Sequence, residues 1–249
     1  MSGHSKWHQI RHKKAIVDKR RGKIFSKIIR EIVVAAKIGG GNPDTNPRLR
    51  LAIQRARSVN MPMENIEKAI KRGTGELEGA HYEECIYEGY GPGGVAIMIE
   101  ALTDNKNRTA AELRSIFSKN GGNMGESGCV AWQFHKKGII TVSKNVISED
   151  ELLNIVVDAG ADDLKVEEEY YEIIVSPENF ENVKNALEKN NIEFSSAEIT
   201  MIPDNFVSVT DPNTARQLTR LLMALEDHED IQHVHTNADI PNEIIEEIQ

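Results

Sequence analysis

The first 38 residues concentrate the side chains best suited to binding a polyanion. They hold eleven Lys and Arg residues against Asp18 and Glu31, a net charge of +9, in a chain whose formal net charge is -9. Trp7 and three histidines stand among these cations. Because phosphate backbones are the commonest biological polyanions and aromatic rings stack on bases, this composition predicts a nucleic-acid contact.

The two signs of charge separate along the chain. Residues 1–78 contain 18 Lys and Arg against 7 Asp and Glu, net +11, which leaves 12 against 32, net -20, in residues 79–249. A basic module is therefore joined to an acidic body. Since the acidic body repels phosphates, we expect any nucleic acid to be held on the basic module alone.

The predicted contact residues lie in an arm (residues 1–21) and in the helices that follow it. The arm has few apolar residues, so it has little to bury. Its contact residues are Lys6, Trp7, His8, Arg11, Lys13, Lys14, Lys19, Arg20 and Arg21. Those of the helices are Lys23, Lys27, Arg30, Arg48, Arg55, Arg57, Lys71 and Arg72. The alternative for all of them is passive solvation, as on the wet face of an ordinary helix.

Other motifs do not support a metal, cofactor or catalytic site. His4, His8 and His12 are four residues apart, but the neighbouring cations repel a metal ion. The glycines of residues 89–94 precede a strand rather than a helix, which favours a hairpin turn over a dinucleotide fingerprint. His233 and His235 fall on one face of a strand without further ligands. No cofactor or metal is predicted, and the chain is interpreted as non-enzymatic.

Three helices are predicted to carry the basic module. Apolar residues recur at helical spacing from Lys23 onward, and three glycines at 39–41 end this first helix. Asn46 and Pro47 form an N-cap and first-turn pair, and Pro62 opens a third helix. A glycine-rich linker follows at residues 73–80. The predicted first domain is residues 1–78.

The acidic body is predicted to contain two α+β domains. Residues 138–203 read as strand, helix, two strands, helix and strand, which is the ferredoxin-like order. A strand–helix–strand unit precedes this segment, with its last strand at 129–134, and another follows it, with strands at 206–210 and 231–236. Neither unit can complete a sheet alone, so we expect them to pair. This gives a middle domain of residues 79–137 plus 204–249 and an inserted domain of residues 138–203.

The bulk composition is that of a soluble cytoplasmic protein. No apolar run approaches the roughly 20 residues that a membrane helix needs. Cys85 and Cys129 lie far apart without a CxxC motif, which is typical of reduced cysteines. The oligomeric state is left open, with a monomer favoured.

Long stretches resemble a known family. The segments GHSKWHQIRHKKAIVDKRRGKIFSKIIREIVVAAKIGGG and YEGYGPGGVAIMIEALTDNKNRTAAELR, together with GGNMGESGCVAWQF, are similar to the YebC/PmpR family. That family is related to the mitochondrial translational activator of cytochrome oxidase subunit one. The resemblance covers essentially the whole chain and implies a helical domain followed by two α+β domains. It implies a transcriptional regulator that binds DNA.

Two alternatives remain open at this stage. For other members the resemblance implies action on the ribosome, so ribosomal RNA is a second candidate partner. The three helices have few Asn or Gln residues placed for base edges, which favours recognition of backbone or shape. An enzyme with a site in the groove between the two α+β domains is the other alternative.

Overall fold

The computed structural model describes residues 21–241 and 243–245. Its contacts divide the chain into two compact units, one containing Trp132–Phe206 and the other containing residues 21–131 and 207–245 except 242. Three hydrophobic cores lie in the described residues, one in a helical module and one in each of two α+β layers. The predicted α+β fold, with an N-terminal three-helix domain and two further αβ domains, is confirmed.

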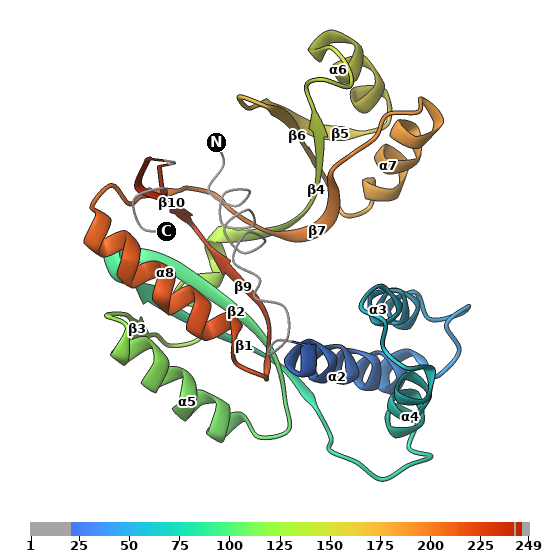
Figure 1. Cartoon of the computed structure of the whole chain (residues 1–249), viewed down its shortest axis with the longest axis vertical. Helices are drawn as coiled ribbons and strands as arrows, with labels where there is room; N and C mark the ends of the chain where they lie inside the picture. The colour runs from blue at the N-terminus through green and yellow to red at the C-terminus, as the bar shows by residue number, and fades with distance from the viewer. Residues whose placement is uncertain (1–20, 242, 246–249) are drawn as a thin grey trace. The chain divides into compact units, whose positions relative to one another are not determined.

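The helical module consists of α2 (Arg21–Gly39), α3 (Pro47–Ser58) and α4 (Met63–Gly73) (Figure 1). The predicted cap of α3 is confirmed, because the backbone N–H of Leu49 donates to the Asn46 side-chain oxygen at 3.1 Å. The Asn46 amide also donates to the carbonyls of Ala35 at 2.8 Å and Gly40 at 2.9 Å. One buried side chain thus joins the end of α2 to the start of α3.

The middle domain is built on a four-stranded antiparallel sheet in the order β3-β1-β2-β9. Its strands are β1 (Glu83–Gly91), β2 (Val95–Thr103), β3 (Asn123–Met124) and β9 (Ile231–Thr236). The predicted hairpin turn between β1 and β2 is confirmed, with Gly93 and Gly94 at φ of +80° and +74°. Helices α5 (Lys106–Lys119) and α8 (Pro212–Glu226) pack on one face of this sheet (Figure 1).

The predicted strand at residues 129–134 is wrong. Residues Ala131–Gln133 form a short 3₁₀ turn, and Phe134 already belongs to the next strand. The cause is the buried Glu88 carboxylate, which accepts the backbone N–H groups of Gly128 at 2.6 Å, Val130 at 2.7 Å and Ala131 at 2.7 Å. Those N–H groups are therefore not available to a strand partner.

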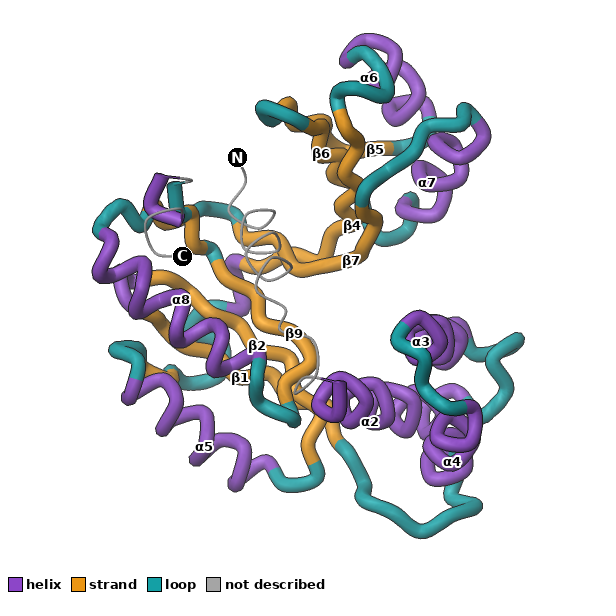
Figure 2. Tube along the Cα trace, viewed as in Figure 1, coloured by secondary structure: helices purple, strands orange, loops and turns teal. Residues whose placement is uncertain are grey.

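The unit that contains Trp132–Phe206 has the predicted ferredoxin-like order (Figure 2). Its elements are β4 (Phe134–Ser143), α6 (Glu149–Asp158), β5 (Ala161–Val166), β6 (Tyr170–Val175), α7 (Phe180–Lys189) and β7 (Ser196–Pro203). The sheet runs β5-β6-β4-β7 with all neighbouring pairs antiparallel. Strand β4 begins before the predicted position at residue 138, because Phe134 already pairs with Pro203.

The strand predicted at 206–210 is shorter and lies elsewhere than expected. It is β8 (Val207–Ser208), which pairs in parallel with β10 (Ala238–Asp239) in a separate two-stranded sheet. Only β9 from this last segment joins β2 in the main sheet, as predicted. None of the described helices is long and apolar enough to cross a membrane.

Candidate nucleic-acid interface

Two of the predicted contact residues on α2 bind the end of α8. The Lys23 ammonium donates to the Asp227 carbonyl at 3.1 Å, and the Lys27 ammonium donates to the Glu226 carbonyl at 2.6 Å. Helix α8 ends at Glu226, so these are carbonyls that lack a partner within the helix. Cations at a helix C-terminus also interact favourably with the negative end of the helix dipole. Lys23 and Lys27 therefore stabilise the contact between α2 and α8.

Arg30 makes the most buried contact of this basic face. Its guanidinium lies 3.1 Å from a carboxylate oxygen of Asp230 and 3.7 Å from one of Glu229, and it also donates to the Glu229 carbonyl. The guanidinium stands 5.3 Å from the centre of the Tyr82 ring. Only 12% of the Arg30 side chain is exposed, so its charge is matched within the chain.

Asp230 is the centre of a polar cluster between α2, α5 and the start of β9. Its second carboxylate oxygen accepts hydrogen bonds from Thr109 at 2.7 Å and Arg108 at 2.9 Å. Burial by itself raises the pKa of the Asp230 carboxyl, but the hydrogen bonds from Thr109 and Arg108 and the charge of Arg30 outweigh burial and hold the pKa below its ordinary value. Sequence periodicity gave no signal for this aspartate.

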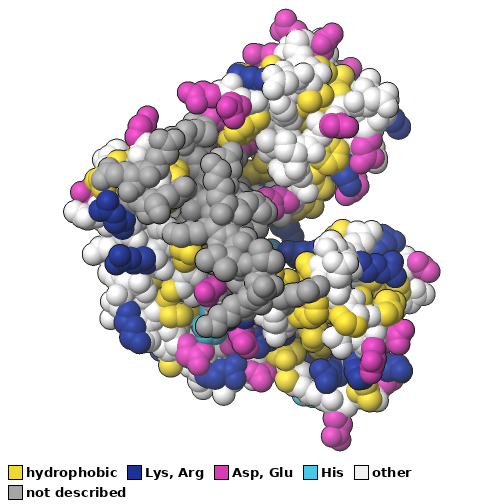
Figure 3. Space-filling view, in the orientation of Figure 1, with side chains coloured by type: hydrophobic (Ala, Val, Ile, Leu, Met, Phe, Trp, Pro, Cys, Tyr) yellow, Lys and Arg dark blue, Asp and Glu magenta, His cyan; other side chains and the backbone are white. Residues whose placement is uncertain are grey.

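The other predicted residues of the helices divide into paired and exposed ones. Arg48 forms an ion pair with Glu84, and Arg55 forms one with Glu31 at 3.1 Å. Arg57, Lys71 and Arg72 are exposed, and within the described part of the chain they have no ion pair. Figure 3 shows Lys and Arg side chains, in dark blue, over the helical module.

The arm lies outside what the structure describes. The predicted contact residues Lys6, Trp7, His8, Arg11, Lys13, Lys14, Lys19 and Arg20 are not among the described residues. Arg21 opens α2, but its side chain is not described either. Their role stays a prediction from the sequence.

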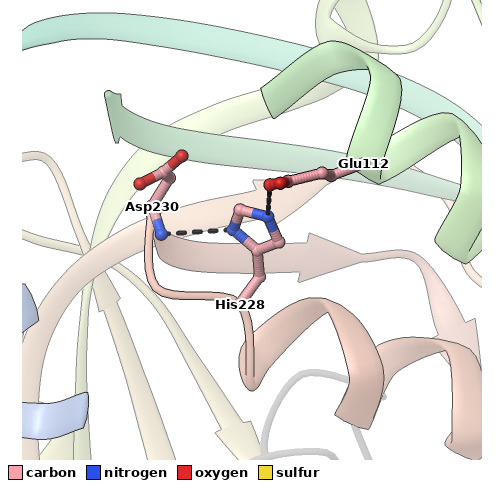
Figure 4. A group of neighbouring side chains, drawn as sticks. All are labelled: Glu112, His228 and Asp230. Atoms are coloured by element: carbon pink, nitrogen blue, oxygen red, sulfur yellow. Dashed lines mark hydrogen bonds and ion pairs between the residues drawn. The ribbon is translucent and has the colours of Figure 1, made fainter. Parts of the chain in front are cut away.

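Glu112, His228 and Asp230 come close enough together to suggest a metal site (Figure 4). The His228 Nε2 atom lies 2.8 Å from the Glu112 carboxylate, and the Asp230 backbone N–H donates to His228 Nδ1 at 3.2 Å. Both ring nitrogens are therefore engaged. The Asp230 carboxylate is already neutralised by Arg30 and Arg108, whose charges repel a cation. The arrangement fits a hydrogen-bonded link between α5 and β9 rather than a metal site.

A cavity of about 350 Å³ lies between the helical module and the main sheet. Its carboxylates are largely partnered, because Glu31 binds Arg55, Glu84 binds Arg48 and Glu100 lies 3.3 Å from His235. The His233 and His235 rings stack at 6.0 Å, in agreement with their predicted common face. The lining residues are Glu31, Arg48, Glu84, Cys85, Ile86, Glu100, Ala101, Leu102, Gln232 and His233.

Neither Cys85 nor Cys129 forms a disulfide, as the sequence indicated. Burial raises the pKa of the Cys85 and Cys129 thiols, so neither is a ready nucleophile at neutral pH. Of the two, Cys85 lines the cavity described above, where the neighbouring carboxylates are paired. A thiol of low reactivity in such surroundings does not form a nucleophile–base pair.

Comparison with known proteins covers nearly the whole chain. Residues 5–76 match the model of the TACO1/YebC protein N-terminal domain, and residues 82–238 match that of the TACO1/YebC second and third domain. A probable transcriptional regulatory protein of Syntrophobacter fumaroxidans is 56% identical over 248 residues, with 100% of both chains covered. One of Geobacter sulfurreducens is also 56% identical over 248 residues, with 100% of both chains covered.

A solved structure shares both sequence and fold with this chain. The crystal structure of a conserved hypothetical protein, Aq1575 from Aquifex aeolicus, is 52% identical with a TM-score of 0.81, and the match covers 96% of this chain and 99% of that one. The fold of nearly the whole chain is thus shared with a solved relative that has half of its residues in common with it. With both family models matched in order along it, this chain belongs to the TACO1/YebC family.

Proposed function

We propose that this chain is a non-enzymatic regulator of gene expression in the cytoplasm, which binds nucleic acid through residues 1–78. The observation that carries the proposal is the division of charge, net +11 in these residues against net -20 in the rest. Such a division concentrates a polyanion at one part of the chain. The relatives in Syntrophobacter and Geobacter are both named probable transcriptional regulatory proteins, which supports a regulatory role with DNA as the partner.

The contacts of the helices support a narrower set of binding residues than the sequence pattern alone. Lys23, Lys27 and Arg30 neutralise the end of α8 and Asp230, so they contribute little charge to an external partner. The arm and the unpaired cations of the helices therefore supply the phosphate contacts. Recognition through the phosphate backbone follows, since phosphate contacts fix position but carry no sequence information directly.

A salt titration tests this function. We expect the affinity for duplex DNA to fall linearly with salt on logarithmic axes, with a slope of about -0.9 for each phosphate neutralised. Replacing Lys13 and Lys14 of the arm by alanine should flatten the slope. The matched control replaces Lys184 and Lys189 of α7 by alanine. These two residues lie in the acidic body, so their loss should leave the slope unchanged. Binding of DNA and RNA that ignores salt would contradict the proposal.

Ribosomal RNA is a second candidate partner. It is favoured by the family relationship to a translational activator and by the scarcity of base-reading side chains on the three helices. Cosedimentation with ribosomes, compared with retention on DNA fragments at the same salt concentration, separates the two. Retention on ribosomes alone would move the proposed role from transcription to translation.

A further inference from the structure

Helix α3 presents cations on two sides of its outer surface, and the two sides differ in their partners. Its sequence, PRLRLAIQRARS, contains four arginines and no acidic residue. Leu49, Ala52, Ile53 and Ala56 are buried in the module, which fixes the direction that every other side chain faces. At about 100° per residue, Arg50, Gln54 and Arg57 fall within about 60° of one another, and Arg48 and Arg55 lie about 140° to 160° from Arg50.

The ion pairs follow the same division. Arg48 and Arg55 are bound to Glu84 and Glu31, and these carboxylates stand beside their flank of the helix. Arg50 and Arg57 on the other flank are exposed and have no ion pair or side-chain hydrogen bond in the described portion of the chain. The positive charges on one flank of α3 are thus neutralised by carboxylates, whereas the two on the other flank have no such partner among the residues that the structure describes.

The helix is held rigidly, so the two free arginines have a fixed separation. Asn46 caps its first turn, and its four inward side chains are buried. Arg50 and Arg57 are two turns apart, about 10 Å along the axis at about 1.5 Å per residue. A rigid helix with cations in a row loses little entropy when it binds a regular backbone of charges.

We propose that this flank of α3 is a contact surface for duplex DNA, with Arg50 and Arg57 on phosphates of one strand. Gln54 lies between them along the helix axis and about 40° from Arg50 toward the most exposed side, and it is the side chain placed to meet a base edge, where its amide can both donate and accept. Charge complementarity favours a phosphate backbone as the occupant. The fixed separation of the two arginines on a capped and packed helix favours a duplex over a flexible single strand. The inference rests on the proposed function and adds Arg50 and Gln54, which the sequence did not single out.

The test compares two pairs of alanine substitutions on the same helix in the full chain. Arg50→Ala with Arg57→Ala should weaken duplex DNA binding by about tenfold or more and flatten the salt slope by about 1.8, since each lost phosphate contact removes about 0.9. Arg48→Ala with Arg55→Ala removes the same number of charges from the paired flank and should change the slope much less. Arg50→Lys with Arg57→Lys should restore the slope. Thermal unfolding should be unchanged in the Arg50 and Arg57 variants, which have exposed side chains, and should be lowered only slightly in the Arg48 and Arg55 variant, because each surface ion pair is worth about 1 kcal/mol or less.

The outcomes separate this inference from the function on which it rests. If the unaltered chain binds DNA with a salt-dependent slope, and the Lys13 and Lys14 substitutions flatten it but those at Arg50 and Arg57 do not, the function stands and the α3 surface is wrong. If the slope flattens only with an RNA hairpin, the surface is right and DNA is the wrong occupant, which overturns the proposal as stated. If the unaltered chain binds neither nucleic acid, the proposed function itself fails.

Discussion

The Arg30 guanidinium lies 3.1 Å from the Asp230 carboxylate, and this ion pair joins helix α2 to the start of β9. Only 3% of the Asp230 side chain is exposed, and the same carboxylate binds Arg108 at 2.9 Å. A cation from the basic module is thus used to neutralise a buried acid of the acidic body. The pair shows that part of the opposite charge in the two halves of the chain serves their own association.

Loss of the Asp230 charge should destabilise the protein strongly. Asp230→Asn leaves Arg30 and Arg108 without their shared partner, and breaking a buried pair in this way costs about 3 kcal/mol or more. The matched control is Asp104→Asn, because Asp104 also lies 2.9 Å from Arg108 but is exposed. That change should cost about 0.5 kcal/mol or less. Urea unfolding measures both, and equal losses would contradict the role given to Asp230.

Acid should remove a definable part of the stability through Glu88. Burial raises the pKa of its carboxyl, but the three backbone N–H donors of Gly128, Val130 and Ala131 outweigh it and hold the pKa below the ordinary value. The stabilisation is therefore complete above about pH 4.3, the ordinary pKa of glutamate, and is lost as pH falls through the lower pKa of the folded state.

Glu88→Gln provides the measurement. Below about pH 4.3 the free energy of unfolding of the unaltered protein should fall more steeply with decreasing pH than that of Glu88→Gln, by up to about 1.4 kcal/mol per pH unit. Glu126→Gln is the control, because Glu126 is an exposed carboxyl in the loop that Glu88 binds, and this variant should keep the steeper dependence. Identical pH profiles for all three proteins would show that Glu88 does not hold the loop as an ionised group.

The ferredoxin-like segment should be removable at its paired ends. Phe134 faces Pro203, and the Asp204 backbone N–H donates to the Gln133 carbonyl at 2.8 Å, so the chain enters and leaves side by side. Replacing residues 134–203 by two glycines should leave a remainder that unfolds cooperatively in urea. Deleting residues 134–195 instead leaves β7 without β4 and should cause aggregation. A non-cooperative transition in the first variant would count against an inserted domain.

The role of Trp7 can be followed by fluorescence. Trp132 is 69% exposed, and Trp132→Phe leaves Trp7 as the sole tryptophan. We expect its emission to be that of a water-exposed indole and to be quenched by nucleic acid, because stacking on a base is worth about 1 to 3 kcal/mol. Trp7→Ala should then weaken binding by about tenfold at an unchanged salt slope. A blue-shifted emission that ignores nucleic acid, with a lower melting temperature for Trp7→Ala, would mark Trp7 as a structural anchor.

The sequence by itself determined the features that depend on neighbouring residues. Asn46 and Pro47 start α3, Gly93 and Gly94 turn the β1–β2 hairpin, and the strand and helix periods give the ferredoxin-like order of β4 to β7. Each of these is set by local backbone preference or by the spacing of apolar side chains, which a linear pattern records. The charge division between residues 1–78 and the rest is likewise a property of the sequence alone.

The tertiary structure decided which charges are available. Lys23, Lys27 and Arg30 form the most regular part of the basic pattern, yet they meet groups about 200 positions away along the chain. Glu88 ended a predicted strand by binding N–H groups some 40 residues on. Periodicity predicts which face of an element turns inward, but it contains no term for the distant partner that neutralises a charge there. For that reason only the folded chain shows that Arg50 has no ion pair among the described residues and that Asp230 is the centre of a polar cluster.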